Sequence, residues 1–155
     1  MTTLSETIEV AATPEAVWAL VSDLPGMGRL SSEAIGGTWV KGATGPALGA
    51  RFTGSNRNGW RRWSTTSAVT EAVPGRDFGF RVRYAGLPVS VWHFAIEPTP
   101  AGCRVTQTWT DERSALLRRS GGVATGVNDR ETHNREGMRT TLQRVKAAAE
   151  VTMEA

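Results

Sequence analysis

The sequence predicts an α+β domain in which a curved, seven-stranded antiparallel sheet wraps around one long C-terminal helix. The first observation is helical periodicity over residues 126–149, the one long stretch that has this pattern and no proline. The second is a series of six alternating segments over residues 37–111, separated by turn-forming residues. Strands joined by such short turns pair antiparallel, because parallel pairing needs a crossover of a dozen or more residues.

The chain is expected to open with a strand and a short helix. Residues 4–11 alternate between apolar and polar side chains, which is typical of a strand with one buried face. Residues 13–15, Thr-Pro-Glu, then give a helix start: a hydroxyl N-cap, a proline at the first helical position and an acid in the first turn. We expect the Pro-Gly pair at 25–26 to end this helix, with a second short helix or a loop over residues 27–32.

Six further strands follow, which gives the element order β-α(α)-β6-α. Their predicted ranges are 37–41, 50–57, 60–73, 76–84, 89–97 and 104–111. Asn58-Gly59 is a strong hairpin signal, because both residues accept the positive φ of a type I′ turn. One face of these strands is apolar and aromatic, and the other is rich in arginine and threonine. We therefore expect the apolar face to be buried against the helices.

The start of the last helix is ambiguous. Asn128 with Glu131 three positions later is similar to a capping box, whereas residues 114–125 read either as a mobile connection or as an irregular earlier start. The expected buried face is apolar from Met138 onward, but its first part carries Glu131 and Asn134. A buried helix face that turns polar lies either near a capped end or along a cavity.

The composition indicates an ordinary globular domain spanning residues 1–155. Hydrophobic residues make up 39% of the chain and charged residues 21%, and this length is enough for one substantial core. The net charge is +3 and the arginines are scattered, so we expect no nucleic-acid partner. A single cysteine, Cys103, cannot form an internal disulfide, which suits the cytoplasm. We expect neither a signal peptide nor a membrane span, because no window reaches 18 apolar residues.

Three stretches resemble the helix-grip superfamily, which includes START-like domains, the pollen-allergen and plant hormone-receptor group, and bacterial polyketide cyclase/dehydrase-like proteins. They are TIEVAATPEAVWALVSDL, VWHFAIEPTPAGCRVTQTWT and MRTTLQRVKAAAE. The most specific feature is a strand followed by an A-x-P-E-x-V-W helix start at residues 12–18. The resemblance implies the helix-grip fold and a hydrophobic cavity between sheet and long helix, open toward the N-terminal end of that helix.

We therefore expect the protein to bind a small hydrophobic or aromatic molecule, such as a lipid, a polyketide or an isoprenoid. The superfamily hosts carriers, receptors, cyclases and hydrolases without a shared catalytic signature, so the resemblance does not decide the activity. One alternative is a polyketide cyclase, aromatase or dehydratase that needs no cofactor. Another is a protein-interaction module with a filled core. The sequence is compatible with a monomer or a homodimer.

Strand and helix periodicity predict which side chains line the cavity. The predicted lining is Phe52, Asn56, Trp63, Ser67, Tyr84, Trp92, Gln107, Trp109, Glu131, Asn134 and Met138. Gln107, Asn134 and Glu131 are the sharpest candidates, because a buried polar group without a partner costs about 1–3 kcal/mol. In an enzyme, Glu131, Asp111 or Tyr84 could move protons. However, Glu131 could instead cap the helix, and Asp111 could lie in an exposed loop.

The sequence predicts no metal site. His93 and His133 are expected on the surface and Cys103 in a turn, so no group of His, Cys and carboxylates has the spacing of metal ligands. The arginines on the outer sheet face are expected to be solvated. They are Arg51, Arg57, Arg81 and Arg83.

Overall fold

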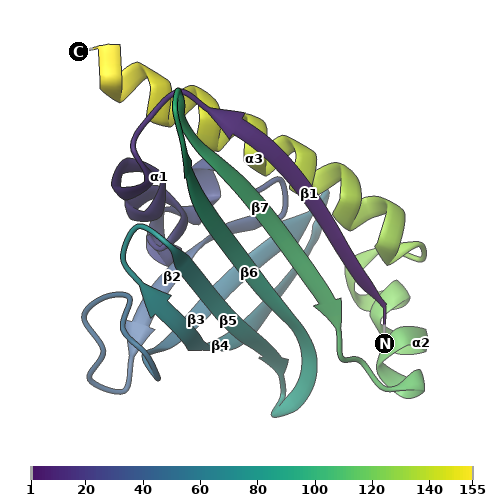
Figure 1. Cartoon of the computed structure of the whole chain (residues 1–155). Coiled ribbons are helices and arrows are strands. Elements are labelled where there is room, and N and C mark those ends of the chain that lie inside the picture. Colours follow the sequence, from purple (N-terminus) through teal and green to yellow (C-terminus); the bar gives the residue numbers. More distant parts are fainter. Residues whose placement is uncertain (1, 155) are drawn as a thin grey trace.

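The structure, a computed structural model, describes residues 2–154. Its strands are β1 (Thr3–Val10), β2 (Ala34–Val40), β3 (Arg51–Asn58), β4 (Arg61–Val73), β5 (Asp77–Tyr84), β6 (Leu87–Thr99) and β7 (Gly102–Asp111). They form one antiparallel sheet in the order β1-β7-β6-β5-β4-β3-β2, and α3 (Arg130–Glu154) runs across its concave side (Figure 1). This is the helix-grip fold that the sequence predicts.

A short helix, α1 (Pro14–Val21), follows β1 and packs against α3. The Thr13 hydroxyl caps it by accepting a hydrogen bond from the amide of Ala16 at 3.2 Å. The helix ends at Val21, earlier than predicted, because Pro25 and Gly26 belong to a separate 3-10 helix, η1 (Leu24–Arg29). The second short helix therefore begins before the predicted range of 27–32.

The C-terminal half of α3 packs into a filled core. Its buried side chains there are Leu142, Val145 and Ala149. In the same core, the ring of Trp18 on α1 meets Phe78 of β5 edge-on, with centroids 6.2 Å apart. The indole N–H of Trp18 donates a hydrogen bond to the carbonyl of Asp77 at 2.9 Å. This half of α3 therefore packs firmly against the sheet. Within the same core, the Trp18 ring has an aromatic neighbour and its indole N–H has an acceptor.

The β3–β4 hairpin turns one residue later than predicted. Asn58 pairs with Arg61, so the two central residues of the turn are Gly59 and Trp60. Gly59 has a φ of 62° whereas that of Trp60 is not positive, which is the pattern of a type II′ turn. Asn58 remains in β3, and its side-chain amide donates to the carbonyl of Thr125 at 2.8 Å. Asn58 is thus a strand residue that contacts α2, and it is not a central residue of the turn.

Residues 114–125 are neither a mobile connection nor an early part of α3, because they form a separate helix, α2 (Ala115–Thr125). The Ser114 hydroxyl caps its start by accepting from the amide of Leu117 at 3.3 Å. Gly126, with a φ of 74°, ends it in the left-handed conformation that favours glycine. The chain therefore turns sharply before α3 begins.

The capping box predicted at the start of α3 does not form. Asp129 caps the helix instead, and its carboxylate accepts from the amide and the hydroxyl of Thr132 at 3.2 and 2.8 Å. Asp129 therefore takes the N-cap role that was expected of Asn128. No helix in the described part of the chain is long and apolar enough to cross a membrane.

Candidate functional site

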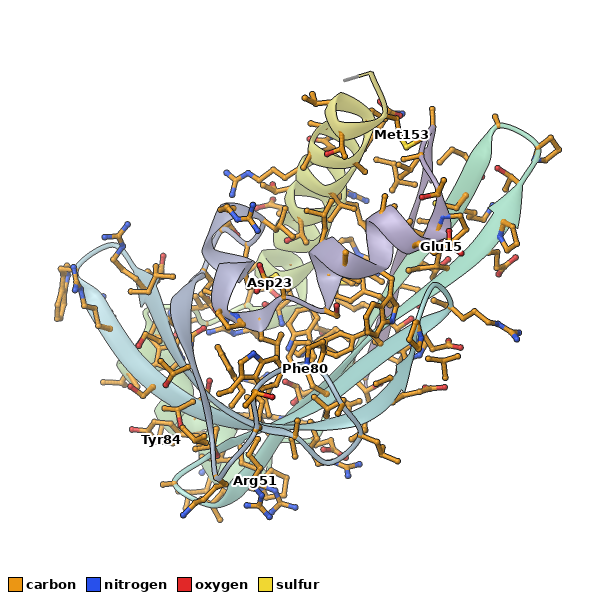
Figure 2. The ribbon with its side chains drawn as sticks, turned by 90° about the vertical axis from the view of Figure 1, so that its left-hand side faces the viewer. Glu15, Asp23, Arg51, Phe80, Tyr84 and Met153 are labelled. Atoms are coloured by element: carbon orange, nitrogen blue, oxygen red, sulfur yellow. The ribbon has the colours of Figure 1, made fainter. Side chains whose placement is uncertain are left out.

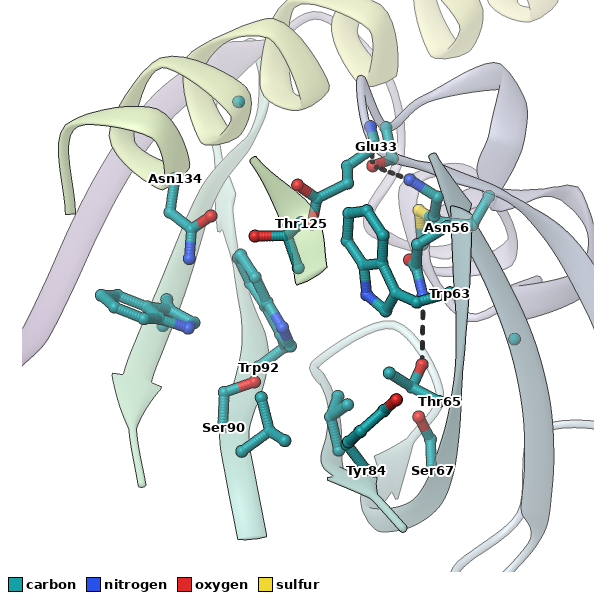
Figure 3. A pocket seen from close by; sticks show the side chains of 18 of the residues that line it. Glu33, Asn56, Trp63, Thr65, Ser67, Tyr84, Ser90, Trp92, Thr125 and Asn134 are labelled. Carbon is teal, nitrogen blue, oxygen red and sulfur yellow. Dashed lines mark hydrogen bonds between the residues drawn. The ribbon is translucent and has the colours of Figure 1, made fainter. Parts of the chain in front are cut away.

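A cavity of about 380 Å³ lies between the curved sheet and the N-terminal half of α3 (Figure 3). Small side chains keep this space open where larger ones would fill it. They include Gly54, Ser67 and Ser90 on the sheet, Gly137 on α3 and Ala124 on α2. Tyr84, Ser120 and Ala124 line the cavity and are themselves exposed, so the cavity meets solvent at the end of β5 and along α2.

Every predicted lining residue except Glu131 borders this cavity. They are Phe52, Asn56, Trp63, Ser67, Tyr84, Trp92, Gln107, Trp109, Asn134 and Met138. Strand alternation alone brings most of them together, because the sheet faces the cavity with every second residue. Trp92 and Trp109 pack together with ring centroids 6.4 Å apart, and Trp63 and Trp92 both point into the cavity (Figure 3). The cavity therefore has aromatic walls.

Glu131 does not line the cavity, contrary to expectation, but is exposed on the first turn of α3. The helix turns Arg130, His133 and Asn134 toward the cavity. Glu131 then projects to a different side, since each residue advances by about 100° around an α-helix. Its carboxylate therefore does not border the space in which a ligand would exchange a proton.

Asp111 is buried rather than in an exposed loop, and its carboxylate is held by Arg113. The Nε and Nη2 atoms of Arg113 each donate to it at 2.9 Å. Burial raises the pKa of Asp111, but the hydrogen bonds from Arg113 and the charge of Arg118 outweigh it and keep the pKa below its ordinary value. An ionised carboxylate held in this way supports the end of β7 and is poorly suited to proton transfer.

A polar cluster that was not predicted lines one side of the cavity. Glu33 accepts hydrogen bonds from Nη1 of Arg130 at 2.8 and 3.0 Å, and its Oε2 lies 3.1 Å from Nε2 of His133. The Nη2 atom of Arg130 donates to the hydroxyl of Thr125 at 2.8 Å. The cluster therefore joins the chain before β2 to α2 and α3. His133 was expected on the surface, but its ring lines the cavity and is only partly exposed.

The ion pair keeps Glu33 ionised. Burial raises the pKa of Glu33, but the hydrogen bond with His133 and the charge and hydrogen bonds of Arg130 outweigh it, so the pKa lies below its ordinary value. Helical spacing of Arg130, His133 and Asn134 could have indicated that all three point one way. Glu33, the partner of Arg130 and His133, lies 97 residues from Arg130 in the sequence, and nothing local signals that pairing.

The free energy of unfolding should fall as the pH is lowered below about 4.5, the ordinary pKa of Glu33. Because its folded pKa is depressed, Glu33 stabilises the fold above that pH, and this contribution is lost as the pH falls through the folded pKa. Glu33→Gln should be less stable than the wild type at neutral pH but should lose less stability on acidification. Urea unfolding of both proteins at about pH 7 and pH 3 measures these free energies of unfolding. If the wild type were more stable than Glu33→Gln by the same amount at both pH values, the prediction would be contradicted.

Gln107 is the polar residue at the bottom of the cavity. It is 5% exposed, and among the described residues its Oε1 is the one fully buried side-chain nitrogen or oxygen without a hydrogen-bond partner. Asn134 on α3 is buried too, and its Oδ1 accepts from Nη1 of Arg130 at 3.4 Å. An unmet acceptor of this kind calls for a physical explanation, because nearly all buried polar groups in proteins are paired.

One group of described residues could share a metal ion, and it lies on the outer face of the sheet, away from the cavity. Glu71, Asp77 and His93 place ligand atoms within 4.8 Å of one another. A β-bulge after Val69 brings Glu71 opposite Gly79, next to His93. No local sequence motif indicates this group, because its members come from three strands. The Nε2 atom of His93 lies 3.0 Å from Glu71 and 3.3 Å from Asp77, so the imidazole lies close to both carboxylates.

Comparisons with known proteins agree with this fold. The protein-family model described as polyketide cyclase / dehydrase and lipid transport matches residues 1–150. A comparison with curated proteins gives no match. The solved structure of the Polyketide_cyc-like protein Cgl2372 from Corynebacterium glutamicum is 29% identical, with a TM-score of 0.67 and coverage of 98% of this chain and 93% of that one.

Two structures with lower sequence identity are similar to this chain in fold. The di-domain ARO/CYC protein StfQ from the steffimycin biosynthetic pathway is 14% identical with a TM-score of 0.74, and the likeness covers 99% of this chain and 52% of StfQ. The Aha1 dimer from Colwellia psychrerythraea is 15% identical with a TM-score of 0.65, over 97% of this chain and 98% of that one. Because the family model matches nearly the whole sequence, the chain belongs to the polyketide cyclase / dehydrase and lipid transport family.

Proposed function

We propose that the protein binds a small aromatic molecule, of polyketide type, in the cavity between the sheet and α3. The observation that carries this proposal is an open cavity of about 380 Å³ whose walls include Trp63, Trp92 and Trp109. Ligand sites of this kind combine apolar and aromatic walls with a few polar groups, and burial of apolar surface supplies about 25 cal/mol per Å². A filled core, which the interaction-module alternative requires, does not fit this arrangement.

The charges around the cavity favour binding over catalysis. A cyclase or dehydratase would need an acid or base free to exchange protons with the ligand. Glu33 is paired with Arg130, Asp111 is paired with Arg113, and Glu131 lies outside the cavity. Tyr84 borders the cavity from the exposed end of β5. Membership in the family is compatible with both binding and catalysis. The arrangement of these carboxylates is therefore the reason to favour binding.

Filling the cavity should weaken binding strongly. In Ser67→Phe the new ring would enter the cavity, because Ser67 faces inward on β4 between Phe52 of β3 and Val82 of β5. We expect a neutral fluorescent probe, 1-aminoanthracene, to bind the wild type saturably at one site and to bind Ser67→Phe at least about ten-fold more weakly, since the apolar contact is lost. Fluorescence titration measures both affinities.

Thr66→Phe is the matched control. Thr66 is the preceding residue, faces the opposite side of the same strand and is exposed opposite Arg83. The variant Thr66→Phe therefore adds the same ring outside the cavity. Its affinity for the probe should stay within about two-fold of that of the wild type. Absence of saturable binding to the wild type, or equal losses in the two variants, would refute the proposed site.

A further inference from the structure

Gln107 lies where the filled core ends and the cavity begins. On β7 it stands between Val105, which is buried in the core, and Trp109, which lines the cavity. Its register partner on β6 is Phe94, which is 1% exposed. The carboxamide thus forms part of the cavity floor, with apolar side chains on both sides of it along the strand.

The surrounding protein groups do not satisfy the Gln107 carbonyl. Its neighbour on β1 is Glu6, whose Oε1 accepts from Arg135 at 2.8 Å and lies 3.3 Å from Nε of Arg139. Burial raises the pKa of Glu6, but the hydrogen bonds from these two arginines outweigh it and the pKa is lowered. Glu6 is therefore ionised at neutral pH and has no proton to donate. The Oε1 of Gln107 stays without a donor although it is buried.

The aromatic neighbours restrict what could supply that donor. Trp109 follows two residues along β7, and its ring packs on Trp92 at a centroid distance of 6.4 Å with a tilt of 43°. The two indoles form one apolar wall next to the carboxamide, while Met138 of α3 packs against the same pair. A planar ring fits against this wall, because aromatic faces and edges contact one another favourably at such distances.

We infer that the ligand is a phenol, whose hydroxyl donates a hydrogen bond to Oε1 of Gln107 while its rings lie against Trp92 and Trp109. This deepens the proposed function and rests on it. A site with a buried group built to pair with a hydroxyl rejects analogues that lack it, because the group is then left unpaired. Ethers and ketones of the same shape offer only acceptors, so they should be disfavoured. The cavity would therefore select hydroxylated aromatic rings.

The test compares 2-naphthol with 2-methoxynaphthalene, which differ by the hydroxyl proton and one methyl group. In the wild type we expect 2-naphthol to bind about ten-fold more tightly, and in Gln107→Met, which keeps the side-chain length but offers no amide, we expect the two affinities to agree within about two-fold. Thr108→Val is the control, because Thr108 is the next residue, faces outward and hydrogen-bonds Ser5 at 3.0 Å. It should retain the preference. Isothermal titration calorimetry gives each dissociation constant.

The outcomes separate this inference from the proposed function. Equal affinities in the wild type, or a preference that survives in Gln107→Met, would overturn the inference while binding in the cavity stands. Tighter binding of 2-acetonaphthone than of 2-naphthol would overturn it too, since the carboxamide would then present its N–H₂ group to the ligand. If no naphthalene binds, the proposed function itself fails. If Gln107→Met does not fold, equal wild-type affinities for 2-naphthol and 2-methoxynaphthalene would still overturn the inference.

Discussion

Replacing Phe78 with alanine should lower the free energy of unfolding by about 3–5 kcal/mol, whereas Phe80→Ala on the same strand should cost clearly less. Phe78 is 0% exposed and packs against Trp18 in the filled core. Phe80 also points inward, but it borders the cavity and is only partly buried (Figure 2). The first substitution creates a new void among close-packed neighbours, whereas the second enlarges a space that already exists.

Urea unfolding followed by circular dichroism measures both variants. For a chain of this length the loss in Phe78→Ala corresponds to a fall in Tm of roughly 6–20 °C. The pair controls for residue type, strand and side-chain direction, because the two positions are both phenylalanines on the inner face of β5. Equal losses would mean that Phe80 is as tightly packed as Phe78, and an open cavity beside it would then be untenable.

Replacing Arg130 with methionine should have the second largest effect, a loss of about 3 kcal/mol, the lower end of the range for removing one partner of a buried pair. The Arg130 side chain is 12% exposed and that of Glu33 is 23% exposed. Without the guanidinium, the Glu33 carboxylate remains desolvated and has only His133 beside it. Thr125 at the end of α2 loses a donor at the same time. Both the stability and the anchoring of α2 should therefore suffer.

Arg139→Met is the control for removing an arginine from the same helix. Arg139 is 59% exposed and its Nε lies 3.3 Å from Glu6, so its loss should cost at most about 1 kcal/mol. Hydrogen exchange adds a local readout, because the amides of α2 should exchange faster in Arg130→Met than in Arg139→Met. If the two variants are equally stable and α2 is equally protected, the cluster around Glu33 does not hold α2 in place.

Patterns within single segments of the sequence predicted most of the fold. They failed where the interacting residues lie far apart in the sequence. Strand alternation identified the inward faces of β4 to β7, because a register shift of one residue would expose every apolar side chain on a strand. The Asn-Gly turn preference failed at Asn58, which stays in β3 and donates its side-chain amide to the carbonyl of Thr125 on α2. The periodicity of α3 failed at Glu131, because the helix turns Arg130 and His133 toward the cavity and Glu131 lies about 100° around the helix from Arg130.

The sequence by itself determined the helix-grip architecture and the set of strand residues that face α3, because both depend on periodicities of two and 3.6 residues along the chain. Only the tertiary structure decided the chemistry of the cavity. It paired Glu33 with Arg130 and Asp111 with Arg113, so these carboxylates are not free to exchange protons with a ligand. It also left Oε1 of Gln107 without a hydrogen-bond donor. The physical reason is that hydrogen bonds and ion pairs act over a few ångströms, and the chain brings these groups together only when it folds.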